Sequence, residues 1–286
     1  QPSDDVVTGV GDDAAVLCQP NGDFQVISTD HLRGFIADPG LMTRIAAVHA
    51  LGDVWAMGAQ PQVGLASIVL PQMSADLQRR TLLEITKVAT EVLNAAGAQL
   101  VGGHTTMGAE LTIGFTVTGT KNSMPLTIAG AKHGDALILT RPIGSGVILA
   151  ADMLGQAEGH NVAATLAIMG QPQDREATVL STVAHAMTDV TGFGLAGHVH
   201  AICQASGLDA HLFQDAIPTY PGARALSDAG VSSTLMPENY TDAPVNGLHD
   251  ALLYDPQTAG GLLASVPKIQ SAAVIEALGA LGCTGH

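Results

Sequence analysis

The sequence predicts a two-domain protein of the α/β or α+β class. Its 286 residues exceed the usual size of a single domain. In both halves, short runs of β-branched and aliphatic residues are mixed with longer helical patterns. The turn-rich segment NSMP at 122–125 separates the two halves. We therefore predict an N-terminal domain at residues 1–122 and a C-terminal α+β domain at residues 123–286.

Strands and helices alternate in the first half. Residues 41–58 are small and apolar almost all round, which predicts a buried helix. Residues 75–96 form the clearest amphipathic pattern, with Ser74 placed as an N-cap and Gly97 just past the end. Four short apolar runs bounded by Gly, Pro, Asp or Asn are predicted strands: Phe24–Thr29, Val63–Leu70, Gln99–Gly102 and Leu111–Gly119.

The second half opens with a predicted strand, Ala136–Thr140, and the glycine-rich segment RPIGSGV at 141–147. Further strands are predicted at Asp209–Phe213 and Gly261–Val266. Residues 230–250 contain two prolines and are predicted to be a loop. Helical patterns follow one another at 161–169, 173–186, 194–206, 222–229 and 267–281.

Charge and composition exclude several classes of protein. The net charge is −15, from 11 basic and 26 acidic residues, so a nucleic-acid binder and a protein adsorbed to an anionic membrane are both disfavoured. No apolar run reaches the roughly 20 residues of a membrane span. The three cysteines form no metal or disulfide pattern, which predicts a reducing, cytoplasmic compartment. With only four lysines, any bound polyphosphate must be neutralised mainly by metal ions and backbone amides.

Four aspartates share one local context, at the end of an apolar run or helix and beside Gly or Thr. Carboxylates on such turns can converge on a hard divalent cation, and Mg²⁺ prefers a few carboxylates together with phosphate oxygens. The alternative is that each aspartate is a helix cap or an Asx-turn residue, which are common roles for Asp. The four are Asp13, Asp30, Asp53 and Asp189.

Histidines offer weaker signals. His49 precedes Asp53 by four residues on one helix face, so the pair can share a metal, or the carboxylate can simply satisfy a buried imidazole. His104 follows two glycines that would let a ligand approach the backbone closely, although an ordinary turn fits as well. His185, His198 and His200 lie in helical patterns and are expected on the surface or in the core. The Walker A, GxGxxG, GxSxG and HExxH motifs are absent.

Six segments occur in an order that resembles one enzyme family. They are GDDAAVL, STDHLRGFIADP, RIAAVHALGDVWAMGA, GGHTT, MTDVTGFGLAGH and DPQTAGGLL. The chain is similar over nearly its whole length to selenophosphate synthetases (selenide, water dikinases), and the last two segments are the most specific. Aminoimidazole ribonucleotide synthetase and thiamine-monophosphate kinase belong to the same superfamily and share its two-domain plan.

The resemblance implies synthesis of selenophosphate from ATP, selenide and water, with release of AMP and phosphate. It implies an aminoimidazole ribonucleotide synthetase-like fold whose N-terminal strands pair with a second subunit into a β-barrel, hence a homodimer. Mg²⁺ is the expected cofactor. By the same resemblance, Asp13, Asp53 and Asp189 bind metal, and the nucleotide site includes Asp30, His49, Gly102, Gly103 and His104.

Three departures from the family pattern bear on function. The nucleophilic Cys or selenocysteine and its Lys belong to a loop before GDDAAVL, so no catalytic residue is assigned within the chain and both are expected upstream of Gln1. His49 stands where Asn is usual, and Met107 replaces a common acidic residue. An oxidoreductase-like domain fused upstream is a further possibility. The alternative functions are a non-catalytic ATP-binding scaffold or sensor, and another ATP-dependent enzyme of the superfamily.

Overall fold

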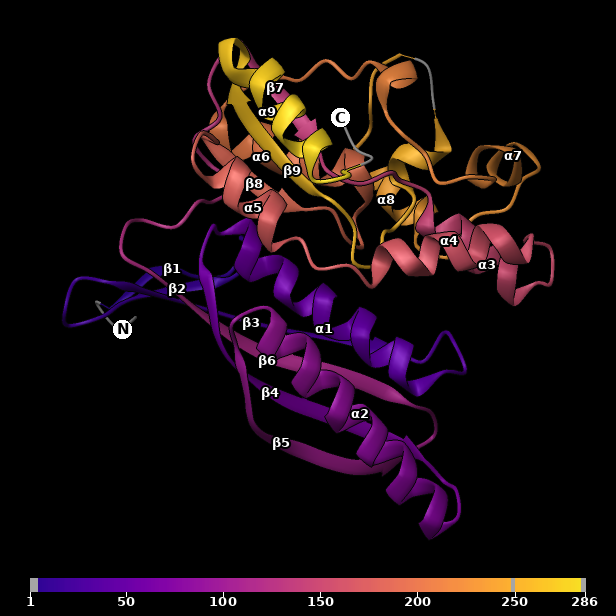
Figure 1. Ribbon diagram of the computed structural model, residues 1–286. Coiled ribbons are helices and arrows are strands. Elements are labelled where there is room, and N and C mark those ends of the chain that lie inside the picture. The colour runs from indigo at the N-terminus through magenta and orange to yellow at the C-terminus, as the bar shows by residue number, and fades with distance from the viewer. Residues whose placement is uncertain (1–4, 248–249, 284–286) are drawn as a thin grey trace. The chain divides into compact units, whose positions relative to one another are not determined.

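The computed structural model describes residues 5–247 and 250–283. It divides into an N-terminal unit, Gln1–Pro125 with Gly170–Asp174, and a C-terminal unit, Leu126–Met169 with Arg175–His286. Helices and strands are mixed in both units (Figure 1), which confirms the predicted fold class. Within the described ranges, no helix combines the length and the apolar character needed to cross a membrane.

The N-terminal unit is built on one six-stranded sheet. Its strands lie in the order β1-β2-β3-β6-β4-β5, and all neighbours are antiparallel except β4 and β5. The helix α2 makes the crossover that a parallel pair requires. The strands are β1 Val6–Thr8, β2 Ala15–Cys18, β3 Phe24–Arg33, β4 Gln60–Pro71, β5 Gln99–Gly108 and β6 Thr112–Lys121.

Two helices cover one face of this sheet (Figure 1). The helix α1 (Pro39–Ala56) is buried at nearly every position, as its all-round apolar pattern predicted. Its N-cap is Asp38, whose carboxylate accepts the Leu41 N–H at 2.8 Å. The helix α2 (Ala75–Ala95) begins at Ser74, whose hydroxyl accepts the Leu77 N–H, and Gly97 follows its end with a φ of 84°. Both predicted caps of α2 are confirmed.

The C-terminal unit has a three-stranded antiparallel sheet in the order β7-β9-β8. The strands are β7 Asp135–Leu139, β8 Ala186–Asp189 and β9 Leu262–Pro267. The core joins this sheet to the surrounding helices and includes the buried side chains of Tyr220 and Tyr254. The helices are α3 Ser145–Met153, α4 Gly159–Met169, α5 Asp174–Ser181, α6 Gly194–Ser206, α7 Ala223–Asp228, α8 Met236–Asp242 and α9 Lys268–Ala280, with the 3₁₀ turns η1 Gln214–Ala216 and η2 Ala251–Tyr254.

Three sequence predictions for this unit are wrong. The predicted strand Asp209–Phe213 is irregular, and its apolar pattern reflects the packing of Leu212 against the hydrophobic core and not strand pairing. The helix predicted at 173–186 ends at Ser181, and Ala186 starts β8, a strand too short to show a period. The predicted loop 230–250 contains α8, because Pro237 lies in the first helical turn, where proline is tolerated.

Candidate functional site

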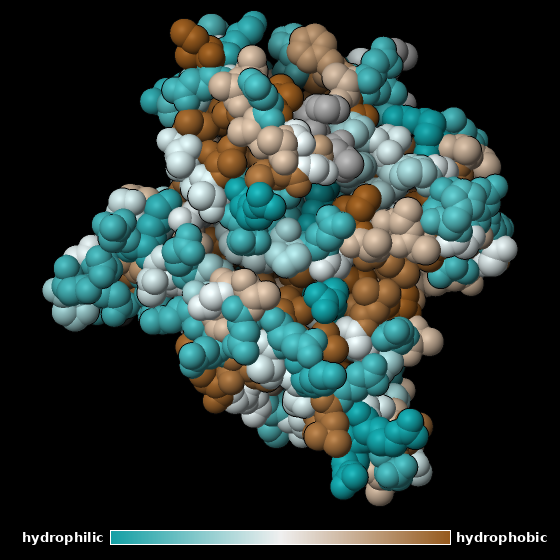
Figure 2. All heavy atoms as spheres, in the orientation of Figure 1, coloured by the Kyte–Doolittle hydropathy of each residue, from teal (hydrophilic) through white to brown (hydrophobic). Residues whose placement is uncertain are grey.

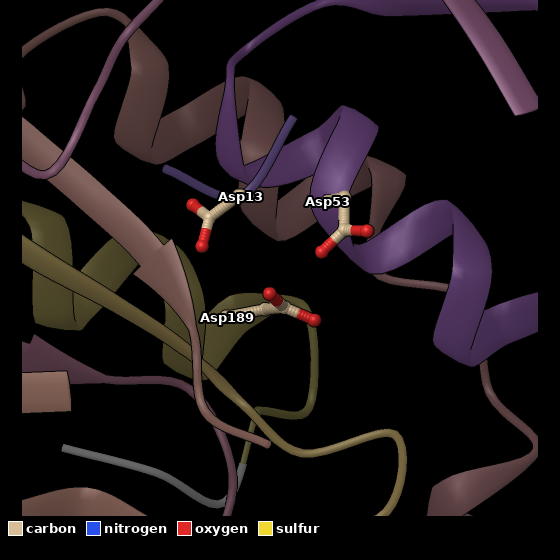
Figure 3. A group of neighbouring side chains, drawn as sticks. All are labelled: Asp13, Asp53 and Asp189. Atoms are coloured by element: carbon tan, nitrogen blue, oxygen red, sulfur yellow. The ribbon is translucent and has the colours of Figure 1, made fainter. Parts of the chain in front are cut away.

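Two of the predicted metal-binding aspartates, Asp13 and Asp53, have their carboxylates close together in the N-terminal unit. Asp53 projects from the buried helix α1, and Asp13 lies just before β2 (Figure 3). Carboxylate oxygens of the two residues lie within 4.8 Å of each other. Ser28 of β3 ties the two segments together, because its hydroxyl donates to the Asp53 carboxylate and lies 3.4 Å from the Asp13 carbonyl oxygen. Two carboxylates at this separation repel each other, and a hard cation between them relieves the repulsion.

The prediction that His49 is buried on the same helix as Asp53 is confirmed. His49 is 9% exposed, and burial lowers the pKa of its imidazole, while the negative charge of Asp30 acts in the opposite direction. The structure therefore brings Asp30 of β3 into the electrostatic neighbourhood of His49. Since burial outweighs the carboxylate, the ring is neutral at neutral pH.

The segment Gly102–His104 does not form the turn that the sequence predicted. It lies inside β5, an edge strand that continues to Gly108. A Cβ on Gly103 would lie 2.1 Å from the carbonyl oxygen of Ala66 in β4, so this glycine is explained by the close approach of the neighbouring strand. The strands β6 and β4 separate β5 from β3. At about 4.8 Å per strand, Gly102–His104 therefore lies roughly 14 Å from the strand that carries Asp30.

Asp189, also drawn in Figure 3, is the last residue of β8 in the C-terminal unit. It is 3% exposed and pairs with Leu262 of β9. The turn that follows it is tied to the DPQTAGGLL segment by two backbone hydrogen bonds, Val190 N–H to the Gly261 carbonyl at 2.8 Å and Gln257 N–H to the Thr191 carbonyl at 3.0 Å. The two most specific sequence segments are thus neighbours in space.

The DPQTAGGLL segment also caps the helix α3. The Gln257 side-chain oxygen accepts the N–H groups of Gly144 and Ser145 at 3.0 and 3.1 Å, and the Asp255 carboxylate accepts that of Gly146 at 2.9 Å. The glycine-rich segment RPIGSGV therefore has its first amides occupied by side chains of the same unit. The sequence singled out both segments but did not predict that they contact each other, because neither segment contains a pattern that identifies its partner.

Asp255 is held in an unusual environment. One of its oxygens accepts hydrogen bonds from Gly146 and Gln257, whereas the other is buried and makes no hydrogen bond within the described part of the chain. Burial raises the pKa of this carboxyl to about 7, despite the opposing effect of hydrogen bonding from the Val147 backbone, the Gln257 side chain and the Gly146 backbone. The carboxyl is consequently close to half-protonated at neutral pH.

We predict that Asp255 makes stability fall as pH rises. The native state keeps the proton between an unfolded pKa of about 4 and the native pKa of about 7, so the penalty is absent below this window and complete above it. Relative to Asp255→Asn, the wild type should lose about 2 kcal/mol between about pH 5.5 and pH 8. Urea unfolding of both proteins at the two pH values measures this difference. A difference that does not change with pH would contradict the prediction.

The family models for AIR synthase related proteins match both halves of the chain. The N-terminal domain model matches residues 11–120, and the C-terminal domain model matches residues 132–285. A solved structure described as the hydrogenase maturation protein HypE in complex with ATP has a TM-score of 0.68 at 20% identity, over 89% of this chain and 72% of that one. This likeness supports the two-domain fold.

Relatives with curated names identify the family more narrowly than the fold does. The selenide, water dikinase of Bdellovibrio bacteriovorus is 34% identical over 282 residues, which cover 94% of this chain and 80% of the relative. That of Desulfitobacterium hafniense is 37% identical over 268 residues, covering 90% and 77%. At this identity and coverage the family is shown, so the chain belongs to the selenide, water dikinase family, with the two domains of the AIR synthase related proteins.

Proposed function

We propose that this protein makes selenophosphate from ATP, selenide and water and releases AMP and phosphate. The observation that carries the proposal is the pair of carboxylates on Asp13 and Asp53, held together by Ser28. Both aspartates stand in segments that the family resemblance assigns to metal binding. The chain shares this family with relatives named for that reaction over more than 90% of its length.

Mg²⁺ fits the donor set of this pair, because two hard carboxylate oxygen donors are the ligands that it prefers beside phosphate. We propose Asp13 and Asp53 as ligands, with Asp189 as the third carboxylate by family resemblance. When bound, the ion neutralises phosphate oxygens and stabilises the charge that develops during phosphoryl transfer. The acidic chain needs such a cation, since it has only 11 basic residues against 26 acidic ones.

We also propose that the remaining predicted site residues bind the nucleotide. Asp30 can accept hydrogen bonds from ribose or base donors. The neutral ring of His49 adds hydrogen-bonding capacity without adding charge, unlike an imidazolium. Gly102, Gly103 and His104 lie roughly 14 Å from β3 within their own unit. We therefore propose that they reach the nucleotide across a subunit boundary.

We propose a homodimer formed through the open face of the N-terminal sheet. A Cβ on Gly64 of β4 would touch Leu93 of α2, so the next residue, Leu65, points away from the helices. Leu65 is 45% exposed, and Val101 of the neighbouring strand is also exposed. The outward surface of α2, by contrast, is mainly hydrophilic (Figure 2). An open sheet face that exposes apolar side chains such as Leu65 is a surface that a second sheet would cover.

Light scattering at micromolar concentration tests the dimer. We expect a mass of twice the 29.1 kDa chain, and a shift toward the monomer in Leu65→Lys, because a charge would be buried in the interface. Leu83→Lys is the matched control, since Leu83 is also an exposed leucine, at 59%, but lies on α2. A wild-type monomer at this concentration, or equal effects of the two variants, would contradict the proposed interface.

The nucleophile of the reaction is proposed to lie outside residues 1–286. Burial raises the pKa of the Cys203 thiol, helped by Asp209, which disfavours a thiolate. Cys283 donates to the Thr140 carbonyl oxygen at 2.7 Å. Cys18, at the end of β2, is the nearest in sequence to Asp13. A cytoplasmic location and an upstream oxidoreductase-like domain stay predictions.

³¹P NMR with ATP, Mg²⁺ and selenide tests the function. We expect residues 1–286 alone to bind Mg·ATP without forming selenophosphate, and the protein with the family's Cys/Sec-Lys loop placed before GDDAAVL to form it. A signal from residues 1–286 that is lost in Cys18→Ser would identify Cys18 as the nucleophile instead. Nucleotide binding with no turnover in either protein would favour the non-catalytic, ATP-binding alternative.

A further inference from the structure

His198 of α6 is a buried histidine whose two ring nitrogens both meet the turn that carries Asp189. It is 7% exposed. Its Nε2 lies 3.0 Å from the backbone nitrogen of Thr191, two residues after Asp189. Its Nδ1 lies 3.2 Å from the hydroxyl oxygen of Thr188, the residue before Asp189. The imidazole therefore contacts residues on both sides of Asp189 in the sequence. From the sequence alone, His198 was expected only to lie on the surface or in the core.

The hydrogen-bonding roles of this ring follow from its partners. A backbone N–H can only donate, so Nε2 accepts from Thr191 and the ring proton sits on Nδ1. That proton is donated to the Thr188 hydroxyl, which lies 3.3 Å from the Asp189 carbonyl oxygen and can donate to it in turn. Burial lowers the pKa of His198 to about 4, so this neutral tautomer persists at physiological pH.

A second buried side chain holds the same turn from another element. The Asn239 amide of α8 donates to the carbonyl oxygens of Gly192 and Tyr254, at 2.8 and 2.9 Å. The turn is therefore connected to α8 and to the end of η2 as well as to α6. The hydrogen bonds of the two side chains fall on the backbone and on the hydroxyls of Thr188 and Thr191, so they hold the segment on either side of Asp189.

We propose that His198 is a positioning residue for the Asp189 carboxylate, acting through Thr188 and Thr191, with Asn239 as a second support of the same turn. The inference rests on the proposed role of Asp189 as a metal ligand. Residues that orient a ligand without touching the metal typically change metal affinity by 10- to 100-fold when they are lost. His198 fits that description because its hydrogen bonds fix the backbone on both sides of Asp189.

Calorimetric titration of Mg·ATP into variants of the full chain tests the proposal. His198→Leu removes the hydrogen bonds of the ring and fills its space with an apolar side chain, and we expect the affinity for Mg·ATP to fall roughly tenfold. His198→Gln should recover most of it, because the amide oxygen of Gln can accept the Thr191 N–H. His200→Gln is the matched control, since His200 is exposed on the same helix. Equal effects of the Leu and Gln variants would overturn the proposal.

A double-mutant cycle separates positioning from general structure. Asp189→Asn with His198→Leu should bind no more weakly than Asp189→Asn alone, because a lost ligand needs no orientation. Additive losses would assign His198 to stability and overturn the positioning role. If Asp189→Asn alone leaves the affinity unchanged, the proposed metal role of Asp189 fails and the inference fails with it. If Asp189→Asn weakens binding and His198→Leu does not, the inference alone is wrong.

Thr188→Val covers the case in which His198→Leu does not fold. It preserves the shape of the side chain and removes only the hydroxyl that links His198 to the Asp189 carbonyl. A weaker Mg·ATP affinity at an unchanged melting temperature supports the relay. An affinity equal to that of the wild type overturns it.

Discussion

Asp53→Asn is expected to weaken Mg·ATP binding by roughly 100-fold while leaving the fold intact. The substitution removes one negative charge from a pair of carboxylates that lie within 4.8 Å of each other. At such separations a unit charge contributes about 3 kcal/mol to the attraction of a cation, which corresponds to a factor of about 100. The side-chain oxygen of Asn can still accept the hydrogen bond from Ser28, so the link between α1 and β3 is preserved.

Calorimetry with and without Mg²⁺ provides the measurement. ATP should bind the wild type tightly only with Mg²⁺, and Asp53→Asn should approach the weak affinity measured in EDTA. Asp76→Asn is the control, because Asp76 lies exposed in the first turn of α2 and should leave the affinity unchanged. Equal ATP affinity of the wild type in Mg²⁺ and in EDTA would exclude a metal-bridged site.

Local signals in the sequence predicted several elements of the fold, including the helix that carries Asp53. The all-round apolar pattern at 41–58 predicted a buried helix, and Asp53 lies on that helix in the structure. The N-cap at Ser74 and the glycine at 97 are short-range features and were located correctly. The helix predicted at 194–206 matches α6. In each case, the information lies within a few residues of the feature that it predicts.

Features that depend on distant segments were not predictable in this way. The strand predicted at Gln99–Gly102 was expected to end in a turn, yet β4 pairs with the following residues and the strand extends to Gly108. The partners of His198 come from β8 and the following turn, so its helical pattern carries no sign of them. The link from Gln257 to Gly144 spans more than a hundred residues. The resemblance to a family placed such segments in one protein, but only the structure gives their contacts.

Gly260→Ala is expected to destabilise the C-terminal unit by about 3 kcal/mol and to weaken Mg·ATP binding as well. A Cβ at this position would lie 1.9 Å from the carbonyl oxygen of Val190, which follows Asp189 directly. Because the obstructing atom belongs to the backbone, the clash can be relieved only if the backbone at Val190 or at Gly260 shifts. Such overpacking costs about 1 to 3 kcal/mol. The proposed ligand Asp189 lies beside the carbonyl that must move.

Urea unfolding and calorimetry of Gly260→Ala measure the two effects, with Gly279→Ala as the control. Gly279 lies in α9, and a Cβ there would meet no atom within 4 Å. Alanine at a helical position stabilises by about 0.5 to 1 kcal/mol relative to glycine, so the control should change stability in the opposite direction. If Gly260→Ala is as stable as the wild type and binds Mg·ATP equally well, the close approach of DPQTAGGLL to the Asp189 turn does not constrain the site. If Gly260→Ala loses both stability and Mg·ATP affinity while Gly279→Ala loses neither, Gly260 keeps the turn after Asp189 in the position that binding requires.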